Sequence, residues 1–409
     1  MVELIKHGVY LLDGQKVVED TTGMPSADEA RENTITYGIL RAHDVNGGKG
    51  KEMHIRFDAM MSHDITYVGI IQTARASGLT KFPLPYAMTN CHNSLCAVGG
   101  TINEDDHVFG LSAAKKYGGI YVPANQAVIH QFAREEMVKC GNMILGSDSH
   151  TRYGSLGNMG VGEGGGELVK QLLRNTWDIN APEVVLVWLE GTPRHGIGPH
   201  DVAISLVKAV FESGFVKNKV LEFAGPGVAN LSVDFRNGID VMTTETTCLS
   251  SIWVTDEKVR EHYELHRRPE DYKELRPGKV AYYDSMVRID LSKQESMIAL
   301  PYHPSNAVSI HELQADSETV LRRVEEDTKR RFGDKVHPDL VSKIRDGKVY
   351  ADQGIIAGCS GGTYDNLSEA AAIMKGKTIG NDYFTMSAYP QSTPVYLATT
   401  RNHIAEELL

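Results

Sequence analysis

Long apolar segments, an excess of basic residues and a signal peptide are all missing from this sequence. No uninterrupted apolar run approaches the roughly 20 residues that a membrane-spanning helix requires, and residues 1–8 lack the architecture of a signal peptide. The 42 lysines and arginines are outnumbered by 53 aspartates and glutamates, which argues against a nucleic-acid surface. We therefore expect a cytoplasmic protein without a membrane or nucleic-acid partner, in which local cations decide whether an anionic substrate binds.

Cysteine is scarce as well, and its distribution is informative. The five cysteines are odd in number and scattered, so a disulfide framework is not expected. Cys91 and Cys96 lie five positions apart and do not form the Cys-x-x-Cys of most clusters and zinc sites. Four of the five, including Cys140 and Cys248, fit ordinary buried thiols. Cys359 differs because it follows an apolar strand and precedes Ser-Gly-Gly.

Strands and helices are predicted to alternate along most of the 409 residues. A hairpin at Asp13-Gly14 and a helix over 26–40 come first. Helices are then expected at 65–77, 105–116, 127–139, 201–212, 317–331, 366–374 and 394–409, and strands at 54–57, 84–89, 120–122, 183–189, 220–223, 348–357 and 384–388. This order predicts three-layer α/β/α domains with mostly parallel sheets. The length exceeds one ordinary core, and breaks near Thr192-Pro193 and Pro301 divide the chain into 1–192, 193–302 and 303–409.

The densest group of reactive side chains follows the apolar residues 143–145, which are typical of a buried strand end. It reads Gly146-Ser147-Asp148-Ser149-His150-Thr151. Residues 154–166 come next and contain seven glycines in thirteen positions, which a regular helix or strand would not tolerate without a large entropic cost. The polar group therefore lies where a strand gives way to a loop, a common place for chemistry in α/β proteins.

Three further segments accompany this motif in a fixed order. They are 128–131 (Val-Ile-His-Gln), Gly225-Pro226-Gly227 leading to Glu245, and 352–362 (Asp-Gln-Gly-Ile-Ile-Ala-Gly-Cys-Ser-Gly-Gly). Together the four segments resemble the aconitase and isopropylmalate isomerase superfamily, and most of all its uncharacterised "hydratase" branch. The resemblance covers almost the whole chain and implies aconitase-like N-terminal domains. It also implies a lyase that reversibly dehydrates or isomerises a small hydroxy-carboxylic acid with a [4Fe–4S] cluster.

The resemblance assigns roles to individual residues. In its terms Asp148 pairs with His130, and His150 with Glu245. His92 would help to protonate the leaving hydroxyl. The complete set is catalytic Asp148, His150, His130, Glu245 and His92, substrate-binding Gln72 and Ser149, and Cys359 as the first cluster ligand.

Carboxylate–imidazole pairs have a chemical use that does not depend on the resemblance. An interpretation without function is also open. A carboxylate beside an imidazole fixes its tautomer and raises its basicity, and two such pairs around one pocket allow protons to move to or from a leaving hydroxyl. The alternative is a set of buried polar residues with satisfied hydrogen bonds, which general burial statistics favour for His130 alone. For Gln72, a polar helix surface and a site-lining position are equally expected.

Some positions depart from the family pattern. Cys91 precedes His92 where the family has aspartate, so the carboxylate partner of His92 is missing from the dipeptide. Ser360, Gly361 and Gly362 follow Cys359 where the family has threonine, asparagine and serine. Val241 replaces a common asparagine four positions before Glu245.

The family's other two cluster cysteines, in a Cys-x-x-Cys, and its swivelling domain with the serine base and the substrate arginines have no counterpart in the 409 residues. We expect an incomplete N-terminal part that requires a C-terminal domain or a separate small subunit and is inactive alone. Two alternatives remain open. One is a metal-dependent hydrolase using Asp148 and His150, and the other is a regulatory, RNA-binding role of an apo form.

The cluster expectation can be tested on this chain alone. Anaerobic reconstitution with iron and sulfide should leave little of either after desalting, because Cys359 is one thiolate and clusters are normally held by three or four. Iron and sulfide assays per chain provide the measurement. A stable brown protein with about four irons per chain would contradict the expectation and implicate Cys91, Cys96 or Cys248.

Overall fold

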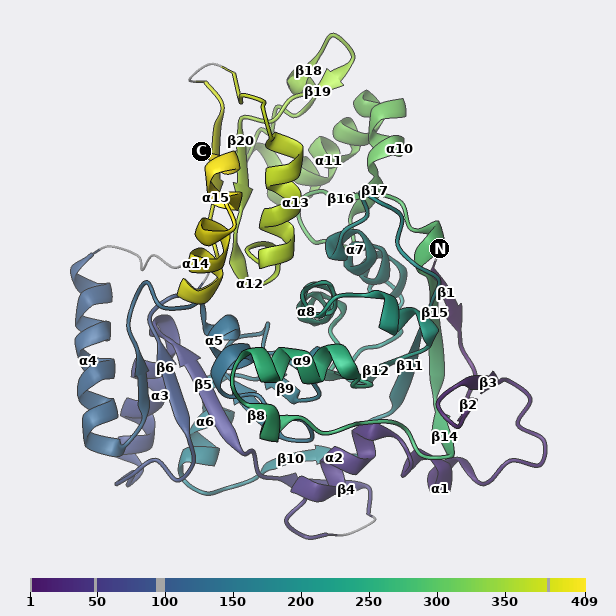
Figure 1. The fold of residues 1–409 in the computed structure, drawn as a ribbon, viewed down its shortest axis with the longest axis vertical. Helices are drawn as coiled ribbons and strands as arrows, with labels where there is room; N and C mark the ends of the chain where they lie inside the picture. The colour runs from purple at the N-terminus through teal and green to yellow at the C-terminus, as the bar shows by residue number, and fades with distance from the viewer. Residues whose placement is uncertain (1, 48–49, 93–99, 381–382) are drawn as a thin grey trace.

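Two five-stranded sheets form the body of the fold in the computed structural model, which describes residues 2–47, 50–92, 100–380 and 383–409 (Figure 1). The first sheet is parallel throughout, in the order β7 (Ile120–Val122), β6 (Tyr86–Thr89), β5 (Ala59–His63), β8 (Met143–Gly146) and β9 (Met159–Gly162). All its strands therefore end at the same edge, where polar side chains gather in α/β folds.

The second sheet is mostly parallel. Its order is β1 (Val2–Ile5), β15 (Ser285–Asp290), β11 (Val184–Glu190), β12 (Val220–Ala224) and β13 (Ser250–Trp253), with β1 antiparallel at the edge. β11 is buried along nearly its whole length, as expected for a central strand covered on both faces. β11 lies before the predicted domain break at residue 193, and it pairs in one sheet with β12, which lies after that break. The three domain ranges stay a prediction.

Helices cover both sheets. On the first, α3 (Asp64–Ala76) packs between α4 (Thr101–Tyr117) and α6 (Gly165–Leu172), and α5 (Ile129–Glu136) contacts β5. Near the second, α7 (Pro199–Val210) packs against α8 (Val233–Met242). One continuous core of buried apolar side chains joins the two sheets.

The C-terminal part of the chain forms a lobe above the two sheets (Figure 1). It contains α10 (Ile310–Ala315), α11 (Ser317–Phe332), α13 (Tyr364–Met374), α14 (Thr393–Arg401) and α15 (Ile404–Leu408), with the parallel pair β20 (Gln353–Ile356) and β21 (Thr385–Ala388). A short helix, α12 (Gly358–Gly361), descends from this lobe to contact α5 and α8. The end of β20 is thereby brought to the first sheet.

The predicted α/β class is confirmed, and several element limits differ. The hairpin at Asp13-Gly14 joins β2 (Val9–Leu12) and β3 (Lys16–Val18), and both turn residues have positive φ. The helix predicted over 26–40 is two helices, α1 (Ala27–Arg31) and α2 (Ile35–His43), because Thr34 adopts an extended conformation and caps the second helix.

Two C-terminal elements are interrupted where the sequence predicted continuous ones. The helix predicted over 394–409 is interrupted between α14 and α15, where His403 has a φ of 61°. The strand predicted over 348–357 is broken into β19 (Lys348–Val349) and β20. Within the described ranges, no helix is both long enough and apolar enough to cross a bilayer.

Gly162 provides a test of this packing. A Cβ there would lie 2.4 Å from the carbonyl oxygen of Asp148, so Gly162→Ala should destabilise the protein by about 1–3 kcal/mol through overpacking. Gly166, in the first turn of α6, meets nothing within 4 Å, and Gly166→Ala should be neutral or stabilising. Thermal unfolding midpoints of both variants give the comparison, and an equal effect would contradict the packing described.

Candidate active site

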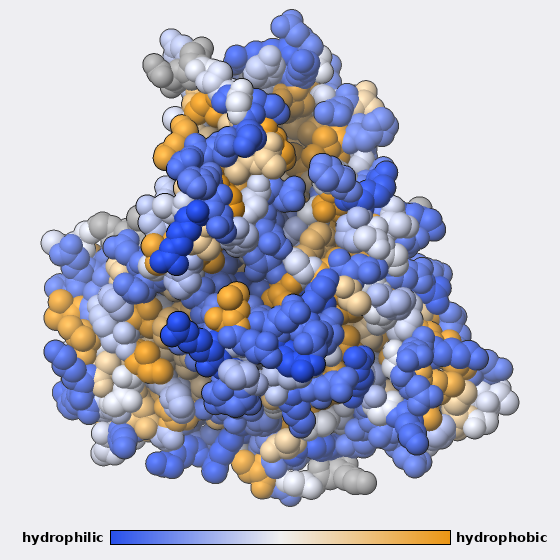
Figure 2. Space-filling model, viewed as in Figure 1, coloured by the Kyte–Doolittle hydropathy of each residue, from blue (hydrophilic) through white to orange (hydrophobic). Residues whose placement is uncertain are grey.

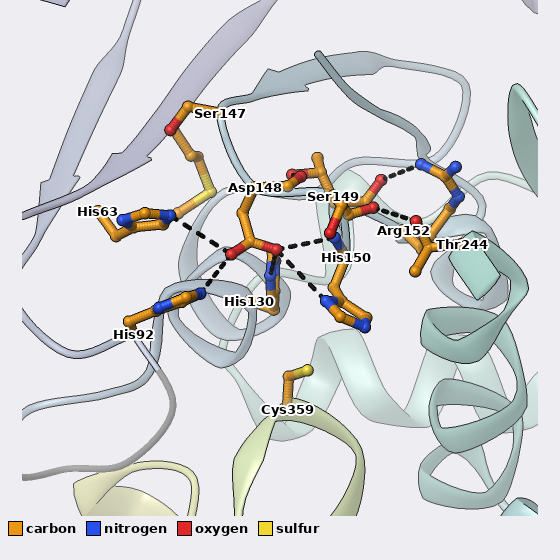
Figure 3. A network of polar contacts seen from close by, with 12 residues as sticks. His63, His92, His130, Ser147, Asp148, Ser149, His150, Arg152, Thr244 and Cys359 are labelled. Carbon is orange, nitrogen blue, oxygen red and sulfur yellow. Dashed lines mark hydrogen bonds and ion pairs between the residues drawn. The ribbon is translucent and has the colours of Figure 1, made fainter. Parts of the chain in front are cut away.

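The site lies at the carboxyl edge of the first sheet and is assembled from three adjacent strands. His63 is the last residue of β5, His92 follows β6, and Asp148 follows β8. The parallel strand order β6-β5-β8 thus places two imidazoles and a carboxylate side by side. Figure 3 shows the rings of His63 and His92 on the same side of Asp148.

The turn after β8 is held by its own hydrogen bonds. The Thr151 hydroxyl and backbone N–H both donate to the carbonyl oxygen of Asp148, at 2.7 and 3.1 Å. The backbone N–H of His150 donates to Asp148 Oδ1 at 2.7 Å, a local bond that aspartate commonly makes in turns. Gly146 is required beneath this turn, because a Cβ there would lie 2.0 Å from Thr151 Oγ1.

Asp148 is buried and surrounded by four imidazoles (Figure 3). Its Oδ2 lies 2.6 Å from His92 Nε2 and 3.4 Å from His63 Nε2. Its Oδ1 lies 2.9 Å from His130 Nε2 and 3.6 Å from His150 Nδ1. Burial by itself would raise the pKa of Asp148, but the four imidazoles outweigh it and hold the pKa well below its usual range. The carboxylate is therefore charged at neutral pH.

His130 and Asp148 form the predicted pair, and the imidazole in it is neutral. His130, at the start of α5, is 1% exposed, and burial lowers its pKa to about 4 in spite of the hydrogen bond to Asp148. Neutral His130 donates through Nε2–H to Asp148 Oδ1, and its Nδ1 accepts from the Tyr153 hydroxyl at 3.1 Å. The tautomer is fixed from both sides.

His150 and Glu245 form the second predicted pair, and the imidazole in it is protonated. Glu245 lies in the 3-10 turn Thr243–Thr246 after α8, and its Oε1 is 3.1 Å from His150 Nε2. Burial lowers the pKa of His150, but hydrogen bonds to Asp148 and Glu245 raise it to about 9. The same hydrogen bond lowers the pKa of Glu245. His150 is thus an imidazolium between two carboxylates.

His92 obtains its carboxylate partner from a distant part of the sequence. Cys91 occupies the position before His92 where an aspartate was expected, yet His92 Nε2 bonds to Asp148. The His92 ring stacks on His63 with centroids 4.1 Å apart, and its side chain is 30% exposed. His92 is therefore oriented by Asp148 and still partly accessible to solvent.

His63 was missed by the sequence analysis. It is buried, and its Nδ1 has no hydrogen-bond partner among the described residues. The available signal was its place at the end of the buried run Ala59–His63, directly before a helix. A single histidine at a strand end gives no indication of which strand lies beside it.

Cys359 approaches the imidazoles from the C-terminal lobe, and its sulfur points toward them (Figure 3). Gly358, with a φ of 84°, turns the chain from β20 into α12. The Cys359 carbonyl accepts hydrogen bonds from Arg134 Nη1 at 2.9 Å and Gln391 Nε2 at 2.8 Å. Burial raises the pKa of the thiol to about 11, opposed by the Arg134 charge.

The other described cysteines are engaged elsewhere. Cys140 and Cys248 donate to backbone carbonyls, each at 3.3 Å, and Cys91 Sγ accepts from a backbone N–H. Cys96 lies outside the described residues. Among the described cysteines, Cys359 is the one that lies beside the imidazoles (Figure 3), and its role as a ligand stays a prediction.

The two predicted substrate-binding residues are placed differently. Ser149 is exposed beside Asp148, and its carbonyl accepts from Thr244 Oγ1 at 2.5 Å. Gln72 is exposed on α3 and forms no hydrogen bond with the site in the part of the chain that the structure describes. A cavity of about 1070 Å³ between α7, α8 and α13 is lined by neither Asp148 nor Cys359. The roles of all these residues stay predictions.

Comparison with known proteins identifies what this chain is similar to. A family model described as "Aconitase family (aconitate hydratase)" matches residues 37–409. The 3-isopropylmalate dehydratase large subunit 1 of Thermotoga maritima is 26% identical over 286 residues, which are 69% of this chain and 68% of that protein. The mitochondrial aconitate hydratase of Aspergillus fumigatus is 27% identical over 369 residues, 84% of this chain and 44% of the relative.

A third relative is the 3-isopropylmalate dehydratase large subunit of Elusimicrobium minutum. It is 27% identical over 295 residues, which are 72% of this chain and 62% of that protein. The chain thus spans between 44% and 68% of the length of these three relatives.

The opposite charge states of His150 and His130 can be measured. Ring NMR of histidine-labelled protein should show His150 titrating near pH 9 and His130 near pH 4. The folded pKa of His150 lies above its ordinary value of 6.5. Its contribution to stability is therefore fully present below pH 6.5 and is lost as pH rises through about 9.

Removal of the Glu245 charge tests the cause of the raised pKa of His150. Glu245→Gln should lower the pKa of His150, because one of its two anionic partners is neutralised. Glu212→Gln, on an exposed residue, is the matched control and should leave His150 unchanged. An unaltered His150 titration in Glu245→Gln would show that the pair does not set its charge.

Proposed function

Because the chain belongs to the aconitase family, we propose that it is the N-terminal part of an iron–sulfur hydro-lyase that reversibly dehydrates or isomerises a small hydroxy-carboxylic acid. The observation that carries this proposal is the ionised Asp148 among four imidazoles, with the Cys359 thiol directed at them (Figure 3). Such a group can deliver a proton to a departing hydroxyl while holding an anionic substrate.

His92 is suited to be the proton donor. With Nε2–H bonded to Asp148 Oδ2, its other nitrogen, Nδ1, is the one that can donate to a substrate. The Asp148 carboxylate fixes the orientation of the His92 ring, as in other carboxylate–imidazole pairs. Neutral and buried His130 does not exchange protons with the substrate in this scheme. It holds Asp148 in place.

His150 supplies positive charge for the substrate. Its raised pKa keeps it protonated at neutral pH, and Glu245 fixes its ring. An imidazolium attracts the carboxylate of a hydroxy acid, and the exposed Ser149 hydroxyl beside it can donate a hydrogen bond. Local cations thus bind an anion in a chain whose net charge is −11.

The proposed cofactor is a [4Fe–4S] cluster with Cys359 as one ligand. When bound, a cluster with one open iron acts as a Lewis acid that makes hydroxide a better leaving group. The remaining ligands and the carbon base would come from a C-terminal domain or a separate small subunit. Two of the relatives are named as large subunits, which supports this arrangement.

A second candidate is hydrolysis at a single metal ion. One ligand atom each from His63, His92 and Asp148 lie within 4.8 Å of one another, and two imidazoles with one carboxylate form a common metal-binding set. Metal analysis separates the candidates. One zinc or iron per chain without sulfide would favour the mononuclear site, whereas iron and sulfide in equal amounts would favour the cluster.

The proposed role of Asp148 predicts the behaviour of Asp148→Asn in the complete natural protein. The amide keeps the shape and loses the charge that orients His92 and His130, so kcat should fall about 10²-fold or more while iron and sulfide contents stay normal. Asp178→Asn is the matched control, because Asp178 pairs with His54 on the surface and should leave kcat unchanged. Near-full turnover of Asp148→Asn would make Asp148 structural.

Cys359→Ser in the same protein should behave differently. A hydroxyl is a poor ligand for iron–sulfur clusters, so iron, sulfide and activity should be lost together. Cys140→Ser, at a buried thiol bonded to a carbonyl, is the control and should retain the cluster. A Cys359→Ser protein that kept its cluster would contradict the proposed ligand.

A further inference from the structure

Arg134 has a buried guanidinium that makes no ion pair with any carboxylate of the described residues. It lies on α5, one helical turn after His130, and is 1% exposed. Its Nη1 donates to the Cys359 carbonyl at 2.9 Å. Its Nε and Nη2 are buried and have no hydrogen-bond partner among the described residues, where no carboxylate oxygen lies within 4.0 Å of its nitrogens.

Two other buried arginines differ in their surroundings. Arg236 is fully buried and forms a two-pronged ion pair with Asp256, at 2.6 and 2.9 Å. Arg152 donates from both terminal nitrogens to backbone carbonyls, each at 3.0 Å. Arg134 has one such bond. A buried charge without compensation costs several kcal/mol, a cost that a nearby anion would offset.

The carboxylates near Arg134 are occupied by other donors. Asp240 accepts from Ser251 Oγ and Trp253 Nε1, both at 2.7 Å, and burial raises its pKa. Asp234 accepts from the backbone N–H of Asp365 at 3.2 Å, and burial and the Asp365 charge raise its pKa to about 6. The element that Arg134 actually holds is the turn carrying Cys359, whose sulfur faces the site (Figure 3).

We propose that Arg134 is a positioning residue that supplies the compensating positive charge for the anionic iron–sulfur centre anchored by Cys359. This inference rests on the proposed function. Each thiolate ligand adds a negative charge to the centre, and net charge is one of the factors that set its reduction potential. Loss of the Arg134 charge disfavours the more negative, reduced cluster. The hydrogen bond to the Cys359 carbonyl fixes the ligand turn beside that charge.

The first experiment measures the cluster in the complete natural protein after anaerobic reconstitution. In Arg134→Gln the reduction potential, followed by EPR, should shift to lower values, and iron and sulfide should be lost faster on desalting. Arg134→Lys keeps the charge and should keep the potential. Arg152→Gln, at a buried arginine directed away from Cys359 (Figure 3), should shift the potential less than Arg134→Gln. An Arg134→Gln protein with wild-type potential and cluster retention would overturn the inference.

The second experiment uses the cluster-free chain and detects a purely structural role. Arg134→Gln should leave the thermal unfolding midpoint unchanged or raise it, because it removes an unpaired buried charge. Arg236→Gln should lower the midpoint, because it leaves Asp256 without its partner. An equal loss in both variants would make Arg134 structural and overturn the inference.

The two proposals fail in different ways. If the complete natural protein takes up no iron–sulfur cluster, the proposed function is overturned, and the inference with it. A wild-type protein that binds the cluster, with a potential indifferent to Arg134→Gln, would overturn the inference alone.

Discussion

The ionised, buried carboxylate of Asp148 is the interaction on which the site depends. A buried carboxylate is stable only when hydrogen-bonded and paired, and four imidazoles from separate parts of the chain meet this need. Two glycines of β8 and β9 make the position of Asp148 possible. Gly146 and Gly162 are paired across these strands and leave room for the turn that presents Asp148.

The charged and neutral groups around Asp148 come from different helices and turns. Burial keeps His130 neutral, and two carboxylates keep His150 protonated. Arg134 adds a fixed cation on the α5 side, beneath the Cys359 turn. Two cations, His150 and Arg134, thus stand beside the carboxylates of Asp148 and Glu245 within an acidic chain. An anionic substrate or metal centre would be attracted by these individual cations. The C-terminal lobe contributes through α12, which brings Cys359 to the sheet edge.

Much of the fold could be predicted from the sequence, because alternating strand and helix patterns directly predict a parallel α/β arrangement. The meeting of Asp148, His130, His150 and Glu245 was implied by family motifs. The contact between His92 and Asp148 could not be predicted from composition or spacing, because it depends on the strand order β6-β5-β8. His63 was missed for the same reason, since a lone histidine after an apolar run has no distinctive spacing. Gln72, for which a polar helix surface and a site-lining position were equally expected, is exposed on α3, and its role stays a prediction.

The charge of Asp148 is the central claim, and its carboxyl carbon reports it directly. Carbon-13 NMR of aspartate-labelled protein, with the Asp148 signal identified by its absence from Asp148→Asn, can be followed as pH falls from 8 to 4. The account predicts that this signal stays at the chemical shift of an ionised carboxylate down to pH 4, because the four imidazoles hold the pKa of Asp148 well below its ordinary value of 3.8. A signal that titrates with a midpoint at or above pH 4 would contradict the account.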